Sequence, residues 1–421
     1  MIHDYRNEDN NMKRKNRLSR RNFVQAGVAL PAAASSAAAA ASAPRIFESA
    51  PVYERLGVRT FINAVGTITT FSGTLMSPEV KAAMDQASSN FVLIHELQEK
   101  AGKRIAELTG AEAAFVTAGA SCALCLSTCA VTAGDDREKM RRLPDVTGMK
   151  DEIIIQKIHH TSYDHAFRMV GAKLVDVETA ADIPKAINAK TAATAFVRSH
   201  HVMGHKVELD EYVEIAHKHN LPVILDAAAE VPPVENLSKF VKMGVDMVAF
   251  SGGKNIRGPQ CSGILMGKKE WIDKAYANAA PANYLPRIAK VGKEEIIGLL
   301  TALELYLRQD HDAERREWYA KLNRIAEGLQ GLPTVYTEFI PNNDFSHSPR
   351  LSVQWDEEKL GLSLKDMVQK LRDGNPSIEA SDMRNFNPPW KGLGLFPYLL
   401  QPGEETIIAN RIAAIVREHA S

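Results

Sequence analysis

The sequence has no excess of either charge and no long apolar run outside its N-terminal region. Lys plus Arg and Asp plus Glu each total 51 among 421 residues, so the formal charge is zero. Proteins that bind nucleic-acid phosphates usually carry a marked basic excess, so this balance gives no support to such a partner. Outside the N-terminal region, no stretch approaches the roughly 20 apolar residues that a membrane-spanning helix needs. We expect neither nucleic acid nor a membrane span.

Cysteine is also scarce, with four residues in the chain. Cys122, Cys125 and Cys129 follow one another at i, i+3 and i+7, so they would share one stripe of a helix. Their neighbours are small and apolar, which favours a tightly packed core helix over an iron–sulfur site. Cys261 stands alone, and we therefore predict no disulfide framework.

The N-terminal region has the features of an export signal. Ser19 to Phe23 (SRRNF) follows the twin-arginine pattern, and an alanine-rich stretch from Val24 to Ala43 ends in small residues. These features predict a removable signal over residues 1–43, recognition by the twin-arginine export machinery, and a periplasmic or otherwise exported protein. The alternative is a basic, alanine-rich tail on a cytoplasmic protein.

From Ala111 to Met266, short β-rich runs alternate with helical stretches. Most runs are continuously apolar, which predicts a mostly parallel α/β sheet of seven strands covered by helices on both faces. Sites in such sheets are expected at the carboxyl ends of the strands. The expected strands are 114–116, 152–156, 173–177, 195–197, 222–225, 247–251 and 263–266, with helices at 181–188 and 209–220.

The later part of the chain predicts a small α+β domain. Few breakers interrupt 293–324, which indicates long helices. A strand at 350–355, a helix at 364–372 capped by Ser363, and a helix at 404–418 are expected to follow. We therefore divide the chain after the signal into an N-terminal arm (44–75), a large domain (76–292), and linking helices with a small C-terminal domain (293–421).

A lysine follows one of the apolar strands through two glycines, in the segment Val245 to Lys254 (VDMVAFSGGK). Partial removal from water at this position would lower the pKa of Lys254 and leave a nucleophilic amine. We expect Gly252 and Gly253 to turn the backbone and leave room for a ring, and Ser251 to reach a phosphate oxygen. On this segment alone, a solvent-facing loop lysine is an equal alternative.

Asp226 ends the preceding apolar strand (LPVILD), one strand–helix unit before Lys254. A crossover of that length joins parallel strands of one sheet. Lysine and carboxylate together predict pyridoxal phosphate (PLP), because the amine forms a Schiff base with it and the anion keeps its ring nitrogen protonated. An isolated aspartate at a strand end is more often a helix N-cap.

A phosphate-binding turn is expected upstream, where Gly119, Ala120 and Ser121 lead from a strand into the cysteine-bearing helix. Amide groups at the N-terminus of that helix, with the Thr117 and Ser121 hydroxyls, would bind the phosphate.

A histidine pair follows another strand. We expect the imidazole of His159 to stack on the PLP ring, with His160 as the alternative and Ala228 packed under the other ring face. A metal site formed with the histidines at 200, 201 and 205 is not favoured, because carboxylates at ligand spacing are missing.

These motifs resemble the fold-type I PLP enzymes and, among them, the selenocysteine synthase-like family, which includes L-seryl-tRNA(Sec) selenium transferases and metabolic relatives of the D-glucosaminate-6-phosphate ammonia-lyase type. The resemblance runs from about Tyr53 onward and rests on Asp226-Ala-Ala, SGGKNIRGPQ (251–260), INAVGT (62–67) and KVGKEE (290–295). It implies a Lys254 aldimine, Arg257 near the phosphate or substrate carboxylate, and a homodimer or larger homo-oligomer. Substrate contacts are expected from Asn63, Thr67 and Arg350.

The expected reaction is α,β-elimination on an amino acid or amino-sugar acid. Lys254 would remove the α-proton, the β-hydroxyl would leave, and a 2-keto acid and ammonia would result. Racemisation, aldol cleavage and transamination use the same groups and are alternatives, as is a non-catalytic exported binding protein, against which Lys254 and Asp226 argue. Selenium transfer is disfavoured by the charge balance, by the little room between signal and fold for a tRNA-binding domain, and by the absence of tRNA outside the cytoplasm. Export would favour an unphosphorylated substrate.

Overall fold

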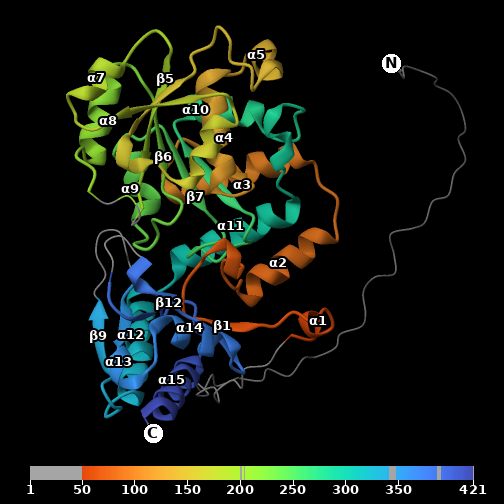
Figure 1. Ribbon diagram of the computed structural model, residues 1–421. Helices are drawn as coiled ribbons and strands as arrows, with labels where there is room; N and C mark the ends of the chain where they lie inside the picture. Colours follow the sequence, from red (N-terminus) through yellow and green to blue (C-terminus); the bar gives the residue numbers. More distant parts are fainter. Residues whose placement is uncertain (1–49, 200–201, 203, 341–347, 386–389, 421) are drawn as a thin grey trace, which may run out of the picture. The chain divides into compact units, whose positions relative to one another are not determined.

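The computed structural model describes residues 50–199, 202, 204–340, 348–385 and 390–420 (Figure 1). The chain divides into two units, 1–43 and 44–421, and the predicted export signal that makes up the first lies outside the described residues. No described helix combines the length and the apolar character needed to cross a membrane.

Seven strands form the central sheet in the order β2-β8-β7-β6-β5-β3-β4. The strands from β7 to β4 run parallel, while β8 is antiparallel to both β7 and β2. The predicted mostly parallel seven-stranded sheet is confirmed. Its strands are β2 (Ala113–Thr117), β3 (Glu152–Gln156), β4 (Lys173–Val177), β5 (Thr191–Val197), β6 (Val223–Asp226), β7 (Met247–Ser251) and β8 (Gly263–Gly267).

Both faces of this sheet are buried, which explains its continuously apolar strands. Along β7, Val248 and Phe250 face a core closed by α3, α8, α9 and α11, whereas Met247 and Ala249 face a core closed by α4, α6 and α10. Cys122, Cys125 and Cys129 are buried along α4, as predicted, and all four cysteines are free. The helices of this part are α2 (Pro78–Ser88), α3 (Ile94–Thr109), α4 (Ala120–Thr132), α5 (Arg137–Arg142), α6 (His165–Arg168), α7 (Asp182–Ala186), α8 (Leu209–Lys218), α9 (Asn236–Lys242), α10 (Lys269–Asn278) and α11 (Lys293–Arg308).

A second core is built mainly from residues after α11. An antiparallel sheet in the order β12-β13-β10-β9 packs with α12, α14 and α15, and the Ser363 hydroxyl caps α14 by accepting from the Asp366 amide at 3.1 Å. The elements are α12 (His311–Gly328), β9 (Tyr336–Ile340), β10 (Arg350–Gln354), α13 (Glu357–Leu360), α14 (Leu364–Asp373), β11 (Ser377–Glu379), β12 (Ser381–Asp382), β13 (Leu393–Leu395) and α15 (Glu404–Ala420). Short 3-10 helices are η1 (Thr69–Phe71), η2 (Lys157–His159), η3 (Ser162–Asp164), η4 (Leu285–Ala289) and η5 (Met383–Asn385).

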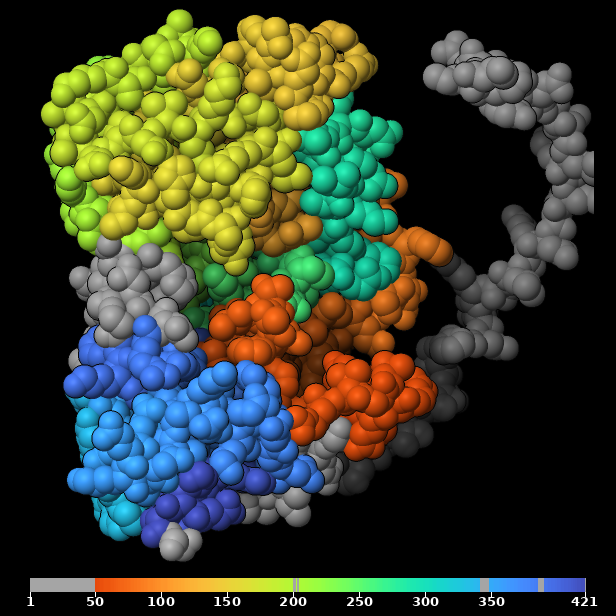
Figure 2. Space-filling view, viewed as in Figure 1, coloured from red at the N-terminus to blue at the C-terminus, as the bar shows by residue number. Residues whose placement is uncertain are grey.

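The N-terminal arm belongs to this second core. After α1 (Pro51–Glu54), strand β1 (Phe61–Asn63) pairs in parallel with β11, and Ile62 is fully buried in the C-terminal core. Arg59 adds a hydrogen bond of 2.7 Å to the Arg372 carbonyl. Figure 2 shows the orange N-terminal segment against the blue C-terminal part. The beginning of the fold is therefore held by residues more than 300 positions later.

Candidate active site

Lys254 follows the carboxyl end of β7, on a turn that packs against a later part of the same loop. The Gly252 amide donates to the Ser262 carbonyl at 2.9 Å, and a Cβ on Gly253 would lie 2.5 Å from the Cα of Gln260. The two glycines thus let chain segments meet directly. Our expectation that they leave room for a ring is wrong, because the loop itself fills that space.

Asp226 ends β6, the neighbour of β7, and its carboxylate is buried. Its Oδ1 accepts from the Ala228 amide at 3.0 Å, and the Ala228 carbonyl accepts from the Ser251 amide at 3.3 Å. Burial raises the pKa of Asp226 and lowers the pKa of Lys254, and the charge of each opposes the shift of the other. The structure therefore brings four predicted site residues together, with Asp226 buried and Ala228, Ser251 and Lys254 partly buried.

The predicted phosphate-binding turn opens α4. Gly119, with φ of 89°, precedes the helix, and no side chain caps the helix N-terminus. A Cβ on Gly119 would meet nothing within 4 Å, so space is open beside the turn. The Thr117 hydroxyl donates to the Gly119 carbonyl at 2.9 Å and so shapes the turn, while Ser121 is exposed. The first amides of α4 are the groups that can receive an anion here.

Gly263, which the sequence analysis did not single out, joins this turn to the lysine strand. It opens β8 and pairs with Thr117 of β2 on one side and Ser251 of β7 on the other. A Cβ at this position would lie 2.5 Å from the Gly119 carbonyl carbon and 2.8 Å from the Ala120 nitrogen. A glycine inside a strand often marks a close approach of another backbone segment, so the sequence did contain a signal for this contact.

The two adjacent histidines lie on different sides of β3. His159 is fully buried, and its Nδ1 accepts from the amide of Val197, the residue paired with Asp226 in the sheet, at 3.4 Å. Its ring meets Phe196 edge-on with centroids 4.3 Å apart. Burial lowers the pKa of His159 to about 3, so the ring is neutral. Of the two histidines, His159 is the one on the Asp226 side.

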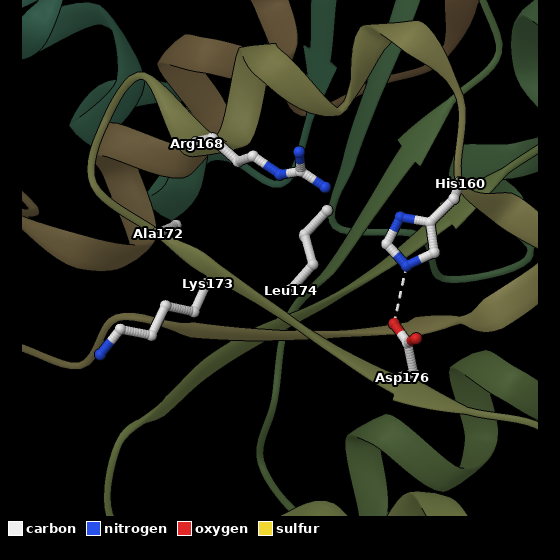
Figure 3. A pocket seen from close by; sticks show the side chains of 6 residues that line it. All are labelled: His160, Arg168, Ala172, Lys173, Leu174 and Asp176. Carbon is white, nitrogen blue, oxygen red and sulfur yellow. Dashed lines mark hydrogen bonds and ion pairs between the residues drawn. The ribbon is translucent and has the colours of Figure 1, made fainter.

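His160 instead faces the outer strand β4. Its Nε2 lies 2.7 Å from Asp176 Oδ1, and its Nδ1 contacts Asp164. Burial alone would lower the pKa of His160, but these carboxylates raise it above its ordinary value. It borders a cavity of about 600 Å³ (Figure 3) whose lining residues are His160, Arg168, Ala172, Lys173, Leu174 and Asp176.

That cavity is separate from the candidate site, since neither Lys254 nor Asp226 lines it. Among the residues that the structure describes, no group of three or more His, Cys, Asp or Glu side chains is suited to a metal ion.

The substrate candidates of the N-terminal arm have roles in its fold. The Asn63 side chain closes its own turn by accepting from the Val65 and Gly66 amides, both at 3.0 Å. The amide and hydroxyl of Thr67 lie near the phenol of Tyr398 and partly offset the rise in its pKa that burial causes. The arm also reaches the lysine turn, because the Gln260 side chain donates to the Thr69 carbonyl at 3.1 Å.

The two candidate arginines differ in their partners. Arg257 donates to Glu314 Oε1 at 2.7 Å and to the Tyr398 carbonyl at 3.2 Å, which ties the lysine loop to the C-terminal part. Arg350 is buried beside the Phe396 ring, and its Nε has no hydrogen-bond partner among the described residues. Of these two cations, Arg350 is the one with a buried donor left to bind an anion.

The residues at the three strand ends fit PLP. Lys254 offers a partly buried amine whose pKa is lowered, Asp226 a buried carboxylate, and the start of α4 uncapped amides beside open space. These are the groups required by the aldehyde, the ring nitrogen and the phosphate of the cofactor.

Comparison with known sequences points to one family. The family model of L-seryl-tRNA selenium transferase (SelA) matches residues 61–331. D-glucosaminate-6-phosphate ammonia lyase of Salmonella typhimurium is 33% identical over 88% of this chain and 99% of that protein. The 5'-C-glycyluridine monooxygenase-decarboxylase of a Streptomyces species is 30% identical over 87% of this chain and 92% of that protein. An L-seryl-tRNA(Sec) selenium transferase of Alkaliphilus metalliredigens is 29% identical over 61% of this chain and 57% of that protein.

Comparison with solved structures agrees with the sequence comparison. D-glucosaminate-6-phosphate ammonia-lyase superposes with a TM-score of 0.79 at 31% identity, covering 89% of this chain and 100% of that one. Serine palmitoyltransferase from S. paucimobilis with a bound PLP–myriocin aldimine gives a TM-score of 0.54 at 16% identity, over 85% of this chain and 88% of that one, which shows the fold alone.

Proposed function

Because the chain belongs to the L-seryl-tRNA selenium transferase family, we propose that it eliminates ammonia from an amino acid or amino-sugar acid that carries a hydroxyl next to the amino-bearing carbon. The chain is a PLP-dependent enzyme of fold type I and a carbon–nitrogen lyase. One observation supports the proposal most: Lys254, Asp226 and the open turn at Gly119 follow strand ends at one edge of the sheet, in a chain that aligns with an ammonia lyase over 88% of its length.

PLP supplies an aldehyde that joins the substrate amine and a ring that accepts the electrons left when the α-proton departs. Lys254 would hold the cofactor, and its amine, with a pKa lowered by burial, would take that proton. The buried carboxylate of Asp226 would favour a protonated ring nitrogen. The β-hydroxyl leaves as water, and addition of water with loss of ammonia gives the 2-keto acid.

Arg350 supports the choice of an acid as substrate. Its guanidinium is buried, its Nε lacks a partner among the described residues, and burial lowers its pKa. A carboxylate is the ligand that relieves such a buried cation, because arginine and carboxylate form charge-assisted hydrogen bonds. Arg257 is engaged by Glu314 at 2.7 Å, so this pair offers no free charge for a substrate phosphate. We therefore favour an unphosphorylated substrate.

We also propose that two copies of the chain pair through apolar side chains near the arm. Phe91, between α2 and α3, is fully exposed, and Leu93, Leu75 and Ile288 are exposed by about two thirds or more. Large exposed apolar side chains of this kind favour a protein partner. A second copy is the occupant we favour because Leu75 continues the arm that contacts the lysine turn, so the dimer would adjoin the site.

Export by the twin-arginine route is a proposal from the sequence. It rests on Arg20 and Arg21 and the alanine-rich stretch that follows them. The expected result is protein in the periplasmic fraction, lost when both arginines are replaced by lysine. Wild-type protein found solely in the cytoplasm would contradict the proposal.

The proposed function is tested by the absorbance of the bound cofactor and by the products of the reaction. The purified protein should be yellow with PLP, and Lys254→Ala should lose the absorbance of the covalently held cofactor. A panel of unphosphorylated 2-amino-3-hydroxy acids and amino-sugar acids should yield 2-keto acid and ammonia in equal amounts. Racemised or aldol-cleaved products alone would overturn the elimination, and a wild type that stays colourless with added PLP would overturn the assignment as a whole.

A further inference from the structure

The ion pair Arg198–Glu230 lies beside the Lys254 site. Arg198 directly follows β5, the neighbour of the Asp226 strand β6. Its backbone amide donates to the Asp226 carbonyl at 2.9 Å. Its Nε donates to Glu230 Oε2 at 2.8 Å, and Glu230 is 1% exposed. The guanidinium also lies 5.9 Å from the centre of the Phe240 ring. Both partners of the pair are thus fixed beside the strand end that carries Asp226.

The turn that holds Glu230 is also tied to the lysine turn. The Asn236 side chain donates to the Glu230 carbonyl at 2.6 Å, and the Glu230 amide donates to the Ala227 carbonyl at 3.1 Å. Asn255, next to Lys254, donates to the Val231 carbonyl at 2.7 Å. The backbone of Glu230 is therefore tied both to the residue after Asp226 and, through Val231, to the residue after Lys254.

Glu230 acts as a second negative charge on the amine. Among the described residues, Asp226 and Glu230 raise the pKa of Lys254, and Glu230 also raises that of Asp226. Arg198 faces Glu230 from the end of β5 and places a positive charge 2.8 Å from its carboxylate. Charges in a water-poor interior act strongly on one another, so the partner of Glu230 matters to the amine.

We propose that Arg198 is a positioning residue for this site: by holding Glu230 in an ion pair, it limits the negative charge that reaches Lys254 and Asp226. The inference rests on the proposed function, since it assigns Arg198 and Glu230 to the protonation of the proposed cofactor anchor. Neither residue is placed in contact with substrate. Arg198 and Glu230 act on the reaction through the electrostatic field that they create at the Lys254 amine.

The proposal predicts shifts of opposite sign. Arg198→Gln removes the positive charge placed against Glu230, so negative charge at the amine grows and its proton is held to higher pH. Glu230→Gln removes the negative charge and leaves Arg198, so the proton is lost at lower pH. Each shift is expected to be about one pH unit. The double variant Arg198→Gln/Glu230→Gln removes both charges and should return close to the wild-type value.

Two readouts apart from activity test this. The first is the pH midpoint of the absorbance change of PLP held on Lys254 in the holoenzyme. The second is the pH dependence of acetylation of Lys254 in cofactor-free protein, followed by mass spectrometry. Arg372→Gln is the control, because Arg372 pairs with Glu379 at 2.8 Å in the C-terminal part of the chain and should leave both midpoints unchanged.

Single variants that shift the midpoint in the same direction, or a double variant that does not return, would overturn the role of Arg198. A merely structural role would lower stability in both single variants without opposite shifts. Failure of the proposed function is separate: in that case the wild type binds no PLP, and the acetylation of Lys254 still reports the effect of Arg198 and Glu230.

Discussion

Gly263 and Gly119 approach so closely that a single methyl group on Gly263 would lie 2.5 Å from the carbonyl carbon of Gly119. The contact joins β8 to the turn before α4, and it sets how near the first amides of that helix come to the strand that precedes Lys254.

Replacing Gly263 by alanine should therefore displace the turn and weaken the binding of PLP phosphate. We expect the dissociation constant for PLP to rise at least about tenfold, which corresponds to about 1.4 kcal/mol. Fluorescence or absorbance titration of cofactor-free protein measures it. Gly267→Ala is the matched control, because its Cβ would strike the Asp246 carbonyl at the far end of the same strand. Equal loss of affinity in both variants would show a general loss of stability instead.

Asp226→Asn should keep the colour of the protein and lose most of its activity. Lys254 is intact in this variant, so PLP is still held, but an amide cannot stabilise a protonated ring nitrogen as a carboxylate does. We expect kcat to fall by about 100-fold or more. Stopped-flow and steady-state assays of keto acid release measure the loss. Near wild-type kcat would show that Asp226 does not lie against the ring nitrogen.

His159 should make the folded state sensitive to acid. Its pKa falls from an ordinary value of 6.5 to about 3 in the folded protein, so below pH 6.5 the unfolded chain binds a proton that the folded chain refuses. Stability is then lost as pH falls from 6.5 toward 3, at up to about 1.4 kcal/mol per pH unit. His159→Phe keeps an aromatic ring beside Phe196 and should reduce the slope of stability against pH between 6.5 and 4, measured by urea unfolding. An unchanged slope would contradict the assignment.

Arg350→Gln should raise KM more than it lowers kcat. A hydrogen bond to a charged group contributes about 1.5–3 kcal/mol, so loss of the carboxylate contact should raise KM by about tenfold or more. Arg384→Gln is a suitable control, since Arg384 is exposed and pairs with Asp382. If KM stays constant and only the stability of the protein falls, Arg350 has a structural role in the C-terminal core and does not bind the substrate.

Phe91→Ser combined with Leu93→Ser should convert the proposed dimer to a monomer with little change in stability, because both side chains are exposed. Light scattering coupled to size exclusion gives the mass. Met169→Ser, at another exposed apolar position, should leave the mass unchanged. A wild type that is monomeric at all concentrations would contradict the dimer.

Local sequence pattern was sufficient for the sheet and for placing Asp226 and Lys254 at the ends of neighbouring strands. Strands buried on both faces are continuously apolar, so β3, β4 and β7 begin and end where expected. Strand β5 begins at Thr191, four residues earlier than expected, because the buried polar residues Thr191 and Thr194 conceal its first half.

Contacts between distant segments could not be predicted in this way. β1 has three residues, and its pairing with β11 leaves no periodic signal. Thr67 meets Tyr398, and Arg257 meets Glu314, only because two cores come together. Glu230 is a buried acid whose partner on β5 is set by the order of the strands.

The pairing of β1 with β11 has a consequence for the timing of synthesis. On a ribosome the arm emerges first, yet the residues that hold Arg59 are made 313 positions later. The arm must wait without its partner strand while the large domain folds, since domains fold as units during synthesis. Its docking then brings Thr69 to the lysine turn. On the proposed export route, the segment that follows the signal therefore reaches its folded position only after β11 has been synthesised.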